Sequence, residues 1–245
     1  MRLTLSTALA FFVASFSHAH LSAAVFFSGS GNNPEAAANA SGEASFAISG
    51  NTLTVVLTNT TSPRTAAQGN ALSGIAFDID SASPTLSLTN TALTSGSAIW
   101  TSKTASNTSD PLSGSWTDVL GSTPPASYGV STSGFNSRFN GGSISLGNSS
   151  PDYGIVAAGT FDGSNVSFAG SKFPFIQKSL TFTFSGIAGI SESQISNVQF
   201  LFGTDGTGLV TSTVPEPHAV FLLLLGTTVL CATSRVALRP MSKFA

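Results

Sequence analysis

The chain has 245 residues, a formal net charge of −2 and 8% charged residues, about a third of the ~25% usual in soluble domains. The single cysteine (Cys231) and the three histidines (His18, His20 and His218) lie near the two ends, so residues 25–213 contain neither imidazole nor thiol. Residues 25–213 therefore cannot carry out Ser-His-Asp or Cys-His catalysis, and they lack the commonest zinc ligands. The same residues include ten acidic and five basic side chains, and this negative balance argues against nucleic-acid binding.

Residues 1–24 have the pattern of a secretory signal peptide. Arg2 supplies one positive charge, residues 3–16 are mostly apolar, and small residues follow up to Ala24. This apolar segment is shorter than the ~20 residues that a membrane-spanning helix needs. We therefore predict export and cleavage after Ala24, with Ala19 as the second choice. An uncleaved N-terminal anchor is the alternative.

Apolar and polar residues alternate with a period of two through 25–202, which predicts β-strands. The alternation recurs in eight segments: 46–48, 53–57, 75–79, 86–88, 144–146, 166–168, 180–184 and 198–202. The clearest of them places Leu180, Phe182 and Phe184 on one face and hydroxyl residues on the other. Gly50 and Asn51 separate the first two segments and predict a two-residue hairpin turn.

This strand pattern, with Gly, Asn, Ser and Pro between the strands and no long amphipathic helix, predicts an all-β fold. We expect residues 25–202 to form an antiparallel β-sandwich, and the sequence leaves jelly-roll and Greek-key orders open. Fourteen phenylalanines in 25–213 would supply much of the buried area. A β-solenoid is the alternative, but no fixed repeat of about 20–50 residues supports it.

Two stretches interrupt the alternation. Residues 101–142 are rich in Ser, Thr, Gly and Pro, and we expect a long excursion that is either functional or disordered. Within it, 110–120 could form one or two helical turns. Residues 203–213 are predicted to be a short linker to the C-terminal segment.

Asp78 and Asp80 are the candidate carboxylates. They lie two apart on a predicted strand, so both should face the side opposite Ile75 and Phe77. Such a pair could supply half of a calcium site, or a catalytic carboxylate of a glycan hydrolase. The simpler interpretation, which we favour, is a solvent-facing strand end with no metal. We expect no cofactor.

Four aromatic residues are candidates for stacking on sugar rings: Trp100, Trp116, Tyr128 and Tyr153. Their Ser- and Asn-rich surroundings fit carbohydrate binding, because a sugar needs both an apolar ring face and polar partners for its hydroxyls. The alternative is that each ring fills the core or fixes the excursion in place.

The C-terminal segment 214–245 combines three features in order. Pro215, Glu216 and Pro217 come first, then the uncharged run 219–234, then the basic residues Arg235, Arg239 and Lys243. As a helix the run would be about 24 Å long, against ~30 Å of bilayer hydrocarbon, so it could span a thin bilayer with the basic end cytoplasmic. A buried core helix is the alternative.

This ordered combination resembles the PEP-CTERM sorting signal of Gram-negative bacteria, and the resemblance is confined to 214–245. It implies that an exosortase recognises Pro215, Glu216 and Pro217 and removes the tail, and that the protein is linked to exopolysaccharide or biofilm formation. The basic end departs from the family pattern, since "VAL" separates its two arginines and the tail continues to Ala245.

The signal peptide, the C-terminal resemblance and the lack of histidine and cysteine in 25–213 together predict an exported, non-catalytic cell-surface or extracellular-matrix component. Its precursor would be tethered to the inner membrane by the C-terminal segment until processing. A carbohydrate-binding module with a polysaccharide partner is the second interpretation, and a carboxylate-based glycan hydrolase is the third.

Overall fold

The computed structural model describes residues 24–33, 38–80, 83–102, 105–108, 112, 115–120, 126–132, 153–161, 173–203 and 208–212. Regular structure in these ranges is almost entirely β-strand, which confirms the all-β class; the exceptions are two short 3-10 helices, Gln68–Asn70 (η1) and Glu192–Gln194 (η3). The signal-peptide residues up to 23, the predicted strands at 144–146 and 166–168, and segment 214–245 lie outside the described ranges. No helix among the described residues is long and apolar enough to cross a membrane.

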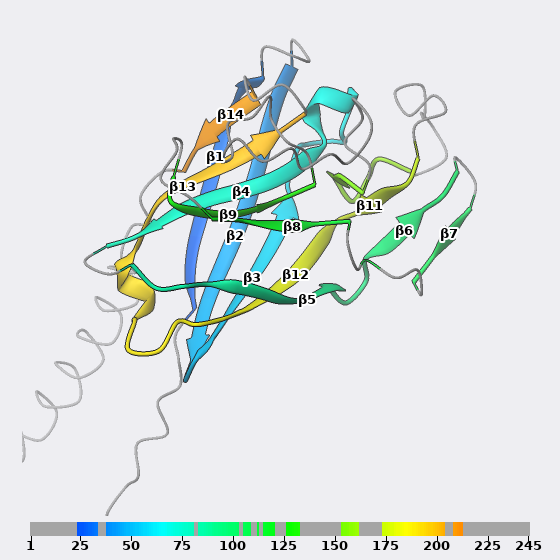
Figure 1. The fold of residues 1–245 in the computed structure, drawn as a ribbon. Coiled ribbons are helices and arrows are strands. Elements are labelled where there is room, and N and C mark those ends of the chain that lie inside the picture. The colour runs from blue at the N-terminus through cyan, green and yellow to red at the C-terminus, as the bar shows by residue number, and fades with distance from the viewer. Residues whose placement is uncertain are drawn as a thin grey trace, which may run out of the picture.

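The smaller sheet has five strands, and each neighbouring pair is antiparallel. Its order is β1 (Val25–Asn33), β2 (Ala38–Ser49), β3 (Thr52–Asn59), β12 (Ser179–Ser185) and β5 (Ser87–Leu93). Figure 1 shows β1, β2 and β3 side by side, with β5 at the far edge.

The larger sheet has nine strands. Its main path is β14 (Gly208–Thr211), β13 (Ile195–Phe202), β4 (Leu72–Ile79), β10 (Ile155–Val156), β11 (Phe175–Gln177), β6 (Ala98–Trp100) and β7 (Ser106–Asn107). A branch runs from β4 through β9 (Tyr128–Ser131) to β8 (Thr117–Leu120). The β10–β11 pair is parallel and the other pairs are antiparallel. The branch lies across the front of the molecule in Figure 1, close to β5.

The predicted hairpin at Gly50 and Asn51 is confirmed. Ser49 pairs with Thr52 across the turn, and Gly50 has a φ of 60° at the first central position, which glycine adopts without strain. On both strands of the hairpin, every second side chain points inward and is buried, as the alternation predicts.

Both sheets bury their apolar faces in one core. The rings of Phe46 on β2 and Phe77 on β4 meet edge to face, with centroids 5.2 Å apart, so they join the two sheets. The inward-facing residues predicted for β12 and β13 are also buried: Leu180, Phe182, Phe184, Val198, Phe200 and Phe202.

Two glycines without side chains leave room for the ring of Phe200. Gly29 on β1 and Gly42 on β2 are register partners, and the ring of Phe200 lies against both. A Cβ at Gly42 would lie 2.8 Å from Cδ1 of Phe200, and a Cβ at Gly29 would lie 3.0 Å from Cδ2. We call this contact the glycine slot; it lets β13 approach the β1–β2 pair closely.

The predicted linker at 203–213 is wrong over part of its length. Gly208–Thr211 pairs antiparallel with β13 as strand β14, and Val210 is buried in the core. The fold therefore continues to Thr211 rather than ending at Phe202. Four residues are too few for alternation to distinguish a short edge strand from a linker.

The expected helical turn at 110–120 is wrong for Thr117–Leu120, which forms strand β8. The reason is that β9 offers this segment a free strand edge, and Thr and Val favour extended backbone. The excursion at 101–142 is correspondingly not one long loop, since β7, β8 and β9 all lie inside it and belong to the larger sheet.

Candidate functional site

The Asp78 carboxylate joins β4 to two other segments. Oδ1 accepts a hydrogen bond from the backbone N–H of Ser127 (2.7 Å), and Oδ2 accepts one from Nδ2 of Asn197 (2.7 Å). Asn197 lies in a bulge of β13 with a φ of 47°, a backbone conformation that asparagine tolerates. Partial burial raises the pKa of Asp78, but the bonds from Asn197 and Ser127 outweigh burial and lower it below the ordinary 3.8.

Asp80 is bonded in the same way just beyond β4. Its Oδ1 accepts from the hydroxyl of Ser196 (2.6 Å), and its backbone exchanges hydrogen bonds with Gln194, whose carbonyl accepts the Asp80 N–H at 2.7 Å. Within the described ranges no group of three or more His, Cys, Asp or Glu residues could hold a metal. The two carboxylates thus fasten the end of β4 to β13.

Asp78→Asn should reduce stability at neutral pH and remove part of the acid sensitivity. Because the folded-state pKa of Asp78 is depressed, its contribution is present above pH 3.8 and is lost as pH falls through the folded-state pKa. We expect a difference of about 1 kcal/mol or less between the two proteins, since the carboxylate is partly solvated. Unfolding by urea at a series of pH values checks this. A difference that stays constant down to about pH 2 would contradict it.

The four candidate aromatic residues are not brought together. Trp116 and Tyr128 are only 3% and 8% exposed, which agrees with the alternative that these rings fill the core. Trp116 packs on Phe182 with centroids 5.0 Å apart. Trp100 is half-buried in a small second cluster, where it stacks on Phe161 (4.6 Å).

The polar atoms of two of these aromatic residues, Trp100 and Tyr128, form hydrogen bonds within the fold. The Trp100 indole donates to Oε1 of Gln177 (3.0 Å), and the Tyr128 hydroxyl donates to the carbonyl of Pro84 (3.0 Å). Burial raises the pKa of Tyr128, and the nearby Asp78 carboxylate raises it further, so the phenol stays protonated and can donate. Tyr153, with a φ of 61°, packs against the edge of the main core. No row of exposed rings exists among these four.

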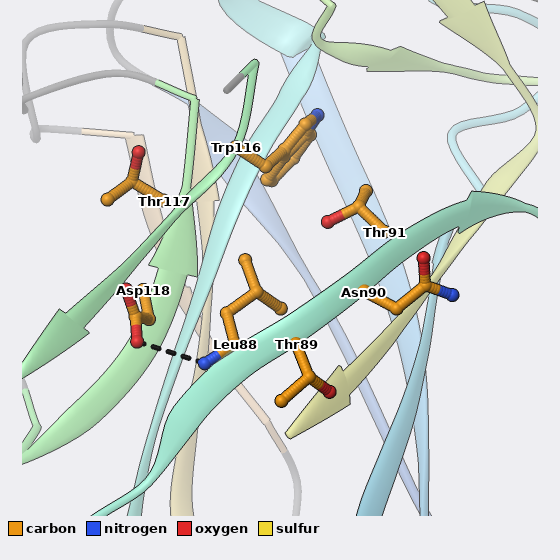
Figure 2. Close-up of a pocket in the computed structure, with 7 residues that line it drawn as sticks. All are labelled: Leu88, Thr89, Asn90, Thr91, Trp116, Thr117 and Asp118. Carbon is orange, nitrogen blue, oxygen red and sulfur yellow. Dashed lines mark hydrogen bonds between the residues drawn. The ribbon is translucent and has the colours of Figure 1, made fainter. Parts of the chain in front are cut away.

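A polar pocket of about 280 Å³ lies between β5 and β8. Its lining comes from two short runs of the chain: Leu88, Thr89, Asn90, Thr91, Trp116, Thr117 and Asp118. Figure 2 shows the side chains of Leu88 and Thr91 extending from β5 toward the Trp116 indole, and the Asp118 carboxylate reaching the backbone N–H of Leu88 (3.0 Å).

The sequence singled out Trp116 alone among these residues. Thr89–Thr91 and Asp118 carry no motif, and they meet only because the edges of two sheets lie next to each other. Comparison of the chain with protein-family models, with curated proteins and with solved structures finds no match.

Proposed function

We propose that this chain is an exported, non-catalytic cell-surface or extracellular-matrix protein that an exosortase processes at its C-terminus. The observation that carries the proposal is the order of three features in 214–245: the Pro215-Glu216-Pro217 motif, the uncharged run 219–234, and the basic residues at the end. In this proposal the uncharged run tethers the precursor to the inner membrane of a Gram-negative bacterium.

The chemistry of the motif suits a processing site. Two prolines two residues apart favour extended backbone and disfavour helix in the residue before each of them, and proteases bind extended substrates. Glu216 resists insertion into hydrocarbon and so helps to fix where the membrane segment begins. A tether that must hold only until cleavage can be short.

Residues 25–213 have features that support a non-catalytic role and export. Residues 25–213 hold no histidine and no cysteine, and both candidate carboxylates are engaged by donors from neighbouring strands. Strand β1 begins at Val25, directly after the predicted signal-peptide cleavage bond.

For the finer architecture we propose a β-sandwich with Greek-key connections. In the smaller sheet, β12 lies between β3 and β5, so strands distant in sequence are neighbours. The chain passes from the smaller to the larger sheet between β12 and β13. Long-range neighbours of this kind are what Greek-key connections produce.

Glu216→Ala should block processing. We expect the processed fraction to fall on the order of tenfold or more in cells that contain the exosortase, with the precursor retained in the inner-membrane fraction. His218→Ala, next to the motif but outside it, is the matched control and should be processed like the wild type. Unchanged processing of Glu216→Ala would contradict the assigned role of this residue.

A further inference from the structure

The pocket between β5 and β8 lies where the edges of the two sheets meet. Strand β5 is the last strand of the smaller sheet, and among the described strands β8 pairs only with β9. The hydrogen bond from the Leu88 N–H to Oδ2 of Asp118 bridges these edges. The pocket is thus a fixed feature of the fold rather than a gap between independent loops.

Its inner wall combines apolar and polar groups. Thr91 pairs with Phe182, so the two side chains share the inward face of the sheet, and the Phe182 ring contacts Trp116. Leu88 adds an apolar surface beside them (Figure 2). The indole N–H of Trp116 is buried and has no hydrogen-bond acceptor among the described residues. In Figure 2 the indole nitrogen lies at the end of the ring away from Leu88, so the part of Trp116 that meets the pocket is apolar.

The outer part of the pocket is hydrophilic. Asn90 is exposed and pairs with Thr183 on the outward face of the sheet. Thr89 donates its hydroxyl to the carbonyl of Thr183 (2.9 Å), so its oxygen can still accept a hydrogen bond. Thr117 and Asp118 line the opposite side. Threonine and asparagine can both donate and accept, as the hydroxyl groups of a ligand require.

We propose that this pocket binds one neutral sugar ring, presented by the end or a side branch of a glycan. Sugar hydroxyls match the hydroxyl and amide side chains, and the apolar face of the ring matches Leu88 and the indole edge. The volume is slightly below the usual range of about 300–1,000 Å³ for ligand pockets, which suits a single ring. This inference goes beyond export and processing and does not depend on the C-terminal tail.

Charge and geometry disfavour two other classes of ligand. The lining holds one carboxylate, Asp118, and no basic residue, so an anionic sugar or a phosphate would be repelled. An extended peptide would need the backbone groups at the edge of β5, but Asp118 already accepts the Leu88 N–H there.

The indole N–H resonance of Trp116, a residue that lines the pocket, reports binding beside the ring. The full chain, labelled with ¹⁵N and held in a zwitterionic detergent without a sugar headgroup, is titrated with the methyl glycosides of glucose, galactose, mannose and N-acetylglucosamine. The chain has two tryptophans, and the indole resonance missing from Trp116→Phe identifies Trp116. We expect its resonance to shift saturably with at least one neutral sugar, with a Kd on the order of 1 mM.

Asn90→Ala should raise that Kd about three- to tenfold through the loss of hydrogen bonds. The matched control is Asn32→Ala, since Asn32 is exposed on β1 at the opposite edge of the sheet and should leave the Kd unchanged. The proposal would be overturned if no neutral sugar shifted the resonance up to about 50 mM. Equal weakening by the two variants, or tighter binding of glucuronate or of an extended peptide, would overturn it as well.

Discussion

Phe200→Ala is expected to lower the free energy of unfolding by about 3–5 kcal/mol, the usual cost of removing a fully buried aromatic ring. The ring fills the glycine slot between β1 and β2, and its removal would leave a cavity there. Gly42→Ala should cost about 1–3 kcal/mol, because its Cβ would meet the same ring at 2.8 Å. Urea unfolding followed by tryptophan fluorescence measures both changes.

Two comparisons make this prediction specific to the slot. Gly31→Ala is the matched control, since its Cβ would make an ordinary contact with Val210 at 3.5 Å, and we expect a change within about 0.5 kcal/mol. In a Phe200→Leu background, Gly42→Ala should cost less than it does alone, because the smaller side chain relieves the clash. Equal costs in the two backgrounds would contradict the slot geometry.

Asn59→Ala is expected to destabilise the protein by about 2–4 kcal/mol. The buried Asn59 amide donates to the carbonyls of Asn70 (2.9 Å) and Ile155 (2.8 Å) and accepts from the N–H of Thr61 (3.0 Å). It therefore links the end of β3 to η1 and β10. Truncation would leave three buried backbone groups without this partner.

The control for Asn59 is an exposed asparagine. Asn32→Ala should change the free energy of unfolding by no more than about 0.5 kcal/mol. Asn59→Asp should be at least as harmful as Asn59→Ala at neutral pH, because a carboxylate would face two carbonyl oxygens. Full stability of either Asn59 variant would contradict the structural role of this amide.

The strands with the clearest alternation could be predicted from the sequence. In β3 and β12 every second side chain is buried, because one face of each strand packs on the core and the other does not. Strand β4 is different. Residues 72–77 are all buried, so both faces of this part of the strand are covered, and alternation in the sequence predicts only one of them. Short strands such as β8 and β14 form because the edge of a neighbouring strand pairs with them. The residues of so short a strand do not themselves show that this pairing will occur.

Less of the candidate site, the pocket between β5 and β8, could be predicted from the sequence. Trp116 stands in a run of Ser, Gly and Thr that suggests exposure, yet its ring packs on Phe182 from the other sheet. The remaining lining residues of the pocket have no distinctive spacing, since they belong to the edges of different sheets. Composition did exclude imidazole and thiol chemistry in 25–213, and that exclusion needs no structure.

The intact mass of the protein from envelope fractions, with and without the cognate exosortase, tests the central claim most directly. With the enzyme, the account predicts a chain that begins at Val25 and ends close to Val214, with any further mass due to an attached glycan or a new anchor. Without the enzyme, it predicts a chain that still ends at Ala245. A mature protein that retains the whole of 214–245 in the presence of the exosortase would contradict the account.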